Sequence, residues 1–185
     1  MLKPVTGRAP TPPPSSSKVN GMGTETTLAL SAAIGAVAGL RSLTAPAIVA
    51  RAAQQGAIDL DDSGLEFLGS PRVANTIAVL AGVELIVDKL PFAPNRTIPG
   101  SLLLRIVSGG ICGAALCQAR KQPLALGAIL GATAAVGAAF AGMELRRRIG
   151  QELHAPGAVA IVEDAIAISG AIAAVSSSYL SELAK

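Results

Sequence analysis

The stretch PLALGAILGATAAVGAAFAGM, residues 123–143, contains no charged side chain. A helix needs about 20 mainly apolar residues to cross the hydrocarbon core of a bilayer, which is about 30 Å thick. This stretch therefore predicts a membrane-spanning helix. The whole chain has a matching composition, with 51% hydrophobic and 15% charged residues. A soluble domain is usually about 25% charged, so the composition also favours a membrane protein.

Four further apolar segments predict helices over residues 26–53, 71–90, 99–119 and 156–180. Ser70 and Pro71 suit the N-cap and the first position of the second segment. The predicted fold class is all-α, a polytopic membrane protein with about five transmembrane helices in a domain of residues 24–185. The acidic stretch between the first two segments is expected to be a water-facing loop. Residues 1–23 are rich in Pro, Ser and Gly and predict a disordered tail.

Lysine and arginine outside the segments predict the orientation. With five crossings, eight of these residues share a side with the N-terminal tail and five lie on the other side. Cytoplasmic loops carry the excess of Lys and Arg. The count therefore predicts that the N-terminus lies in the cytoplasm and the C-terminus outside.

The first and fourth segments are similar to each other. LALSAAIGAVAGL (28–40) aligns without gaps over LALGAILGATAAV (124–136). Three crossings would separate these segments, so they would run in opposite directions. The similarity therefore predicts an inverted-topology repeat, with segments one and two related to segments four and five around segment three. Transporters often have such repeats, and their sites lie near the membrane midplane.

Several ionisable residues within the apolar segments are candidates for a buried charged cluster. They are Arg41, Glu84, Asp88, Arg105, Glu163 and Asp164. At about 1.5 Å of rise per residue, Glu84, Arg105 and Glu163 reach a similar depth from three helices. Arg41 can reach the same level with its long side chain. Pro46, which follows in the same segment, is expected to kink the helix predicted over residues 26–53.

Two interpretations of this cluster stay open. Ionisable residues within membranes commonly mark ion or solute pathways, which predicts a small transporter- or channel-like protein that handles an ion or small charged solute. Buried ion pairs can also serve only to hold helices in register. The protein would then be a non-transporting membrane scaffold or assembly partner.

Small residues recur at helical spacing in two segments. Gly109 and Gly113 make the third segment thin, and Gly127 and Gly131 do the same for the fourth. Such spacing lets helix backbones approach closely within a bilayer. We expect these glycines to pack helices within the chain, with a homodimer interface as the alternative.

Several other functions find little support. The chain has no histidine within a predicted span and none of the nucleophile-elbow or nucleotide-loop motifs, so we expect no enzyme and no cofactor. Low charge and few aromatic residues argue against nucleic-acid binding. Cys112 and Cys117 are expected to be small packing residues, and no metal site is predicted.

A set of short motifs resembles a known family. AGLRSLTAPA (38–47), FLGSP (67–71), VELIVDKLP (83–91), RIVSGG (105–110) and VEDAIAI (162–168) are similar to the bacterial membrane protein family called domain of unknown function 4126. The resemblance covers residues 26–175. It implies a multi-pass protein of the cytoplasmic membrane and supplies no activity, substrate or site residues.

Overall fold

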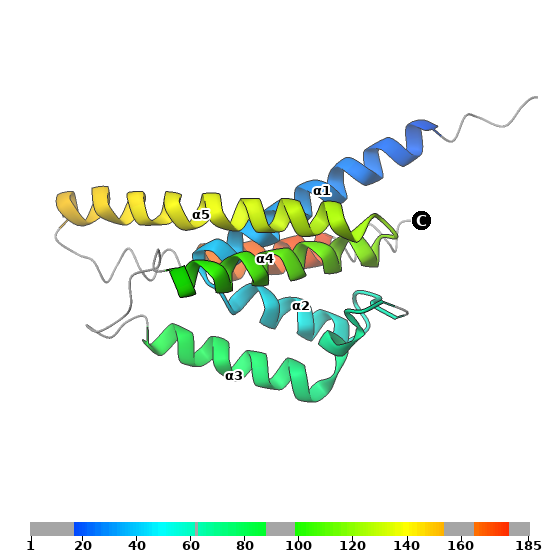
Figure 1. Cartoon of the computed structure of the whole chain (residues 1–185), viewed down its shortest axis with the longest axis horizontal. Coiled ribbons are helices and arrows are strands. Elements are labelled where there is room, and N and C mark those ends of the chain that lie inside the picture. The colour runs from blue at the N-terminus through cyan, green and yellow to red at the C-terminus, as the bar shows by residue number, and fades with distance from the viewer. Residues whose placement is uncertain (1–16, 62, 88–98, 154–164, 178–185) are drawn as a thin grey trace, which may run out of the picture.

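The computed structural model describes residues 17–61, 63–87, 99–153 and 165–177, and all regular structure in these ranges is helical. The helices are α1 (Ser17–Leu40), α2 (Thr44–Gln54), the 3-10 helix η1 (Glu66–Gly69), α3 (Pro71–Val87), α4 (Pro99–Ala119) and α5 (Leu124–Leu153). A C-terminal helix, Ala165–Ser177, follows them. Figure 1 shows these helices lying roughly lengthwise beside one another. The all-α fold class is confirmed.

Two of the described helices are long and apolar enough to cross a membrane, Pro99–Ala119 and Leu124–Leu145. The helix Ala165–Ser177 is apolar but shorter. The start of α3 at Pro71 and both bounds of α4 agree with the sequence prediction. Helix α1 begins at Ser17, so it extends into the segment for which the sequence predicts a disordered tail. The rest of that tail lies outside the described residues.

The first apolar segment is two helices, and the prediction of one helix over 26–53 is wrong. Helix α1 ends at Leu40, the chain turns at Arg41–Leu43, and α2 runs back in the opposite direction (Figure 1). Pro46 lies in the first turn of α2, where its missing N–H group breaks no helical hydrogen bond. The proline therefore helps to start a new helix, and it does not kink a continuous one.

Helices α1, α4 and α5 meet along stripes of small residues, which we call the small-residue seam. Within each stripe the residues are four positions apart. The stripes comprise Ser31, Gly35 and Gly39 of α1, Gly109, Gly113 and Cys117 of α4, and Gly127, Gly131 and Ala135 of α5. A methyl group added at Gly113 would overlap the backbone of Gly127, and one at Gly35 would overlap Gly131. The glycines are thus used for packing within the chain, where they let the backbones touch.

The direction of α1 relative to α5 contradicts the predicted inverted repeat. Gly35 faces Gly131 and Gly39 faces Ala135, so the two helices run side by side in the same direction (Figure 1). These facing residues are the ones that the sequence alignment pairs. Because both helices pack through the same small-residue stripe, their sequences resemble each other without an inverted relation.

Both ends of the described helical region lie at one end of the molecule. The Thr24 hydroxyl donates to the Gln122 side-chain oxygen over 3.5 Å, which places the start of α1 beside the α4–α5 turn. Arg120 of the same turn donates to the carbonyl oxygen of Ser177, at the end of the C-terminal helix. The start of α1 and the end of the C-terminal helix thus lie at the same end of the described bundle, because the turn after α1 adds a reversal of the chain.

The loop between α2 and α3 is anchored to the bundle. Ile58, Leu60 and Leu68 are buried in the hydrophobic core, while Asp59 and Asp61 point outward and are exposed. The acidic residues of this loop are thus water-accessible in the described part, as the sequence predicts. The loop closes the end of the molecule at which α2 stops.

Candidate functional site

The turn between α1 and α2 is a helix break inside the protein. Arg41 is fully buried, and Ser42 and Thr44 are each only 5% exposed. A helix end leaves unpaired N–H groups at its start and unpaired carbonyl groups at its end. Both kinds of end meet at this turn, where most of the residues are buried. Buried backbone groups need hydrogen-bond partners, so other helices must supply them.

Glu84 supplies the partners for the start of α2. Its carboxylate, projecting from α3, accepts hydrogen bonds from the backbone N–H groups of Ser42 and Leu43, each over 2.9 Å, and from the Ser42 hydroxyl. The residue at the N-cap position, Leu43, has no side chain able to cap the helix. Glu84 therefore acts as an N-cap from a different helix. Its negative charge also complements the positive end of the α2 dipole.

Arg105 supplies a partner for the end of α1. Its guanidinium group donates from Nη1 to the carbonyl oxygen of Gly39 over 2.7 Å, and the arginine is only 2% exposed. Gly39 lies in the last turn of α1, where carbonyl groups lack helical partners. A positive charge there complements the negative end of the helix dipole. The break thus has an acid at its positive end and a base at its negative end.

Arg41 lies within the turn itself, between these two contacts, with none of its surface exposed. Both arginines take part in interactions beyond the one with Gly39, so neither positive charge lacks a partner. The structure therefore brings three of the six predicted residues, Arg41, Glu84 and Arg105, to one helix break. The other three, Asp88, Glu163 and Asp164, lie outside the described residues.

The sequence did not indicate that Glu84 and Arg105 bind backbone groups of the helix break. The groups that Glu84 and Arg105 bind are the N–H groups of Ser42 and Leu43 and the carbonyl group of Gly39. A signal was present, because Pro46 is tolerated in the first turn of a helix and not in a helix interior. The high apolar content of residues 26–53 concealed it.

The comparisons with known proteins identify the family. The model of the family named domain of unknown function DUF4126 matches residues 28–183. The chain belongs to this family. The resemblance drawn from the short motifs is thus confirmed. No curated protein and no solved structure gave a match.

In this DUF4126 protein the family match includes the whole helix break and both helices that hold it. Among the residues that the structure describes, no group of three metal-binding side chains comes together. Cys112 and Cys117 are buried and unbridged, and the Cys117 sulfur lies 3.4 Å from the Ser31 hydroxyl. Cys117 belongs to the small-residue seam and Cys112 to the hydrophobic core, which agrees with the packing role that the sequence predicts.

Proposed function

We propose that the protein is an integral membrane protein of the transporter or channel type, with the helix break at Arg41–Leu43 as the centre that handles an ion or small charged solute. The observation that carries the proposal is this break, which lies inside the bundle between charges of opposite sign. At membrane depth, non-helical backbone is tolerated where it is buried in protein or lines a water-filled cavity. Discontinuous helices of this kind form solute sites in many transporters.

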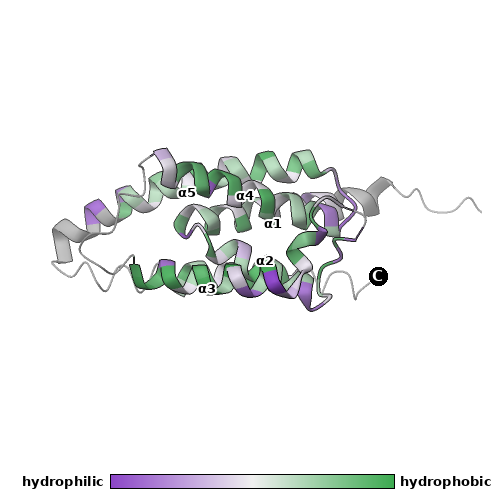
Figure 2. Ribbon diagram, turned by 60° about the horizontal axis from the view of Figure 1, so that its bottom comes forward, coloured by the Kyte–Doolittle hydropathy of each residue, from purple (hydrophilic) through white to green (hydrophobic). Residues whose placement is uncertain are grey.

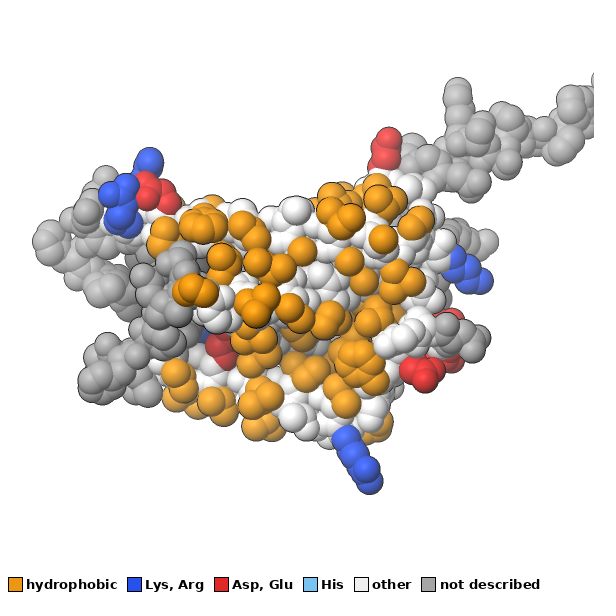
Figure 3. Space-filling model, viewed as in Figure 1, with side chains coloured by type: hydrophobic (Ala, Val, Ile, Leu, Met, Phe, Trp, Pro, Cys, Tyr) orange, Lys and Arg blue, Asp and Glu red, His pale blue; other side chains and the backbone are white. Residues whose placement is uncertain are grey.

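The surface supports embedding in a membrane. Large apolar side chains are exposed on four helices, including Ile86 of α3, Leu103 of α4, Ile129 of α5 and Ile166 of the C-terminal helix. Figure 3 shows hydrophobic side chains spread over the middle of one face, and most of the coloured charged side chains lie towards its edges. Figure 2 shows the same trend along the ribbon, with hydrophilic residues near the helix ends. Soluble monomers rarely expose such continuous apolar surface.

We place both termini in the cytoplasm of a bacterial cell. Chain connectivity assigns two groups of Lys and Arg to the two ends of the bundle. Among the residues that the structure describes, the end of the bundle that holds Thr24 and Ser177 carries Arg51, Arg72, Arg120 and Lys121, and the other end carries Arg147 and Arg148. Cytoplasmic segments carry the excess of positive residues, which favours the end with the termini.

The break offers a solute two kinds of polar group. Ser42 and Leu43 present N–H donors at the start of α2, and Glu84 now occupies them. Gly39 presents a carbonyl group at the end of α1, and Arg105 now occupies it. A charged solute would enter by exchanging with one of these side chains, which requires no covalent chemistry. We therefore propose a binding and conducting role without catalysis.

A second function is favoured by one specific observation. The three donors that Ser42 and Leu43 present are already bonded to Glu84, and the helices around the break are in backbone contact along the seam. In a non-transporting scaffold or assembly partner, these bonds would be permanent and the charges purely structural. The difference between the two functions is whether water reaches the break.

Cysteine labelling in sealed membrane vesicles tests the proposal. The Leu43→Cys variant places a thiol at the half-buried break, and a small charged thiol reagent reports whether water reaches it. We expect reaction from one side of the membrane. The wild-type protein gives the background, since Cys112 and Cys117 are fully buried. Asp61→Cys in the exposed loop is the positive control, and Ile129→Cys on the apolar surface is expected to stay unreactive.

Two results would count against the proposal. A Leu43→Cys protein no more reactive than the wild type, in vesicles where Asp61→Cys reacts, would favour the scaffold function. A reactive Ile129→Cys would show that the apolar surface of α5 faces water. That second result would contradict embedding in the membrane as well.

A further inference from the structure

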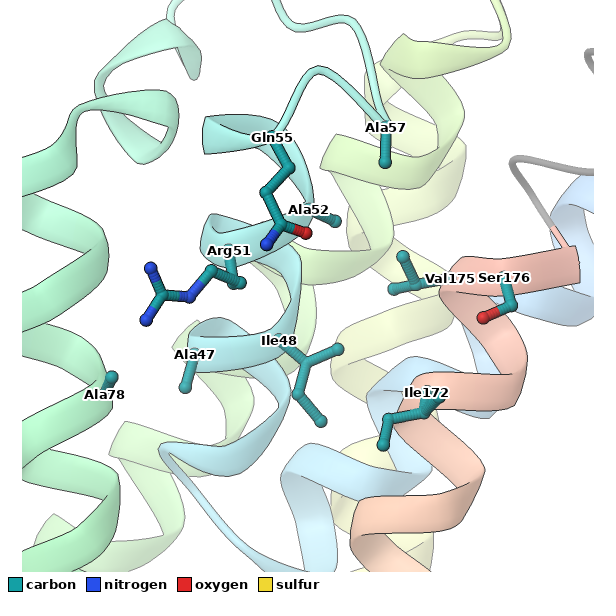
Figure 4. A pocket seen from close by; sticks show the side chains of 10 residues that line it. All are labelled: Ala47, Ile48, Arg51, Ala52, Gln55, Ala57, Ala78, Ile172, Val175 and Ser176. Atoms are coloured by element: carbon teal, nitrogen blue, oxygen red, sulfur yellow. The ribbon is translucent and has the colours of Figure 1, made fainter.

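A groove runs along the outer side of α2, away from the helix break. Helix α2 forms its floor, and α3 and the C-terminal helix form its two sides (Figure 4). Its volume is about 680 Å³, which lies within the range of small-molecule binding sites. Most of the lining is apolar, from Ala47, Ile48, Ala52, Ala57, Ala78, Ile172 and Val175. The groove is open at the surface, where Ile172 on its rim is 52% exposed.

The remaining lining residues are polar and include a single charge. They are Arg51, Gln55 and Ser176, and none of the described residues that line the groove is acidic. Arg51 and Gln55 project from the last turn of α2 and the residue after it (Figure 4), beside the loop that carries the exposed Asp59. The groove is thus apolar along its length and positively charged where α2 approaches this water-facing loop.

We propose that this groove binds one anionic phospholipid, with an acyl chain along the apolar lining and the headgroup phosphate on Arg51. The proposal rests on the membrane location proposed above. The exposed guanidinium uses Nη1 to donate to Gln54 over 3.0 Å, and its other N–H groups can donate to a phosphate. Arginine suits phosphate because it offers parallel donors in a fixed plane. The net charge of the lining selects an anionic headgroup over a zwitterionic one.

The length of the groove suits a lipid. Its lining from α2 and the residues after it runs from Ala47 to Ala57, along most of the helix. The 11 residues of α2 give a length of about 16 Å, roughly half the hydrocarbon thickness of a bilayer, which is the depth that the acyl chains of one leaflet occupy. A bound lipid would steady α2 from the side opposite the seam.

Lipid binding to the purified full-length protein tests this inference. Native mass spectrometry in detergent compares phosphatidylglycerol with phosphatidylcholine of the same acyl chains. We expect tighter binding of phosphatidylglycerol. The Arg51→Gln variant should lose about fivefold in affinity for it, the effect of about one interfacial positive charge, and should bind phosphatidylcholine unchanged. The control is Arg72→Gln, an exposed arginine at the start of α3 that does not line the groove, and it should bind like the wild type.

A second variant tests the apolar part. Ala78→Leu adds volume to the side of the groove formed by α3 and should weaken binding of both lipids, because the acyl chain loses room. Equal binding of the two lipids by the wild type, or equal losses for Arg51→Gln and Arg72→Gln, would overturn the headgroup assignment. Unchanged binding by Ala78→Leu, with a wild-type melting temperature, would overturn the groove as the site. Glycerol phosphate binding as tightly as the whole lipid would overturn the acyl-chain contact.

Cell fractionation separates this inference from the proposed function. If the protein is recovered in the soluble fraction, the membrane location fails and the lipid proposal fails with it. If it stays in the membrane fraction but shows no lipid selectivity, only the lipid proposal fails.

Discussion

The small-residue seam and the helix break lie next to each other and are held together in opposite ways. The seam has no charged residue and depends on backbones that touch, as at Gly113 and Gly127. The break depends on charged side chains that reach backbone groups of another helix, as Glu84 does. Gly39 belongs to both, since its Cα faces Ala135 and its carbonyl oxygen accepts from Arg105. The seam fixes how close the helices lie, and the break fixes where the chain turns back.

This difference predicts different responses to substitution. A close backbone contact cannot adjust to extra atoms, so the seam should be intolerant of added volume. The break should tolerate volume better but should be sensitive to the loss of an acceptor, because buried N–H groups without partners are costly. The predictions below compare the two regions, with the largest effect first.

Gly131→Leu should be the most damaging change. A side chain at this position of α5 would overlap the carbonyl oxygen of Gly109 in α4 and displace the backbone. We expect a loss of more than about 3 kcal/mol, at the upper end of overpacking effects, and no stable bundle. Thermal unfolding in detergent measures the effect.

Gly137→Ala is the matched control for that experiment, because it lies on the same helix and has no atom within 4 Å of the added carbon. It should keep or slightly raise the melting temperature, since alanine favours helix more than glycine does. If Gly131→Leu melted at the same temperature as Gly137→Ala, the backbones of α4 and α5 could not be in close contact at Gly131.

Glu84→Ala should destabilise less than the seam variant but more than any exposed substitution. The N–H groups of Ser42 and Leu43 would lose their acceptor, with an expected loss of about 2–3 kcal/mol. Glu84→Gln keeps one acceptor oxygen and should lose about half as much. The exposed Glu66→Gln serves as the control and should stay within about 0.5 kcal/mol of the wild type. A Glu84→Ala protein as stable as Glu66→Gln would mean that Glu84 does not cap α2.

Ser42→Ala should have the smallest effect in this series. It removes only the hydroxyl donor to Glu84 and leaves both backbone N–H donors in place. The expected loss is about 1 kcal/mol, the typical net contribution of one hydrogen bond. In a background of Glu84→Ala the same substitution should have almost no effect, because its acceptor is already gone. Additive losses would show that the hydroxyl acts through another partner.

The sequence predicted the seam better than the break, for a physical reason. Glycines four residues apart on one helix are a local pattern, and Gly109, Gly113, Gly127 and Gly131 pack within the chain as we expected. The bounds of α4 could also be predicted from the local sequence, because Pro99 marks its start. Only the direction of α1 against α5 was wrong, because it depends on how many times the chain turns back.

The break could not be predicted from local pattern alone. Residues 26–53 are apolar enough for one long span, and the capping group that favours a turn comes from Glu84, far along the chain. The sequence indicated that Glu84 and Arg105 lie at a common depth, within reach of the long side chain of Arg41. It could not indicate that two of them bind the backbone of the turn beside Arg41, since that contact exists only once α3 and α4 have packed.

The positions of the two chain termini in the membrane show whether the chain turns back at Arg41–Leu43. Full-length protein is fused at either terminus to a fluorescent protein that folds only in the cytoplasm, or to a phosphatase active only outside it. Because α1 and α2 form a hairpin, the account predicts that both termini report the same side of the membrane. A straight helix over residues 26–53 would place them on opposite sides, and that result would contradict the account.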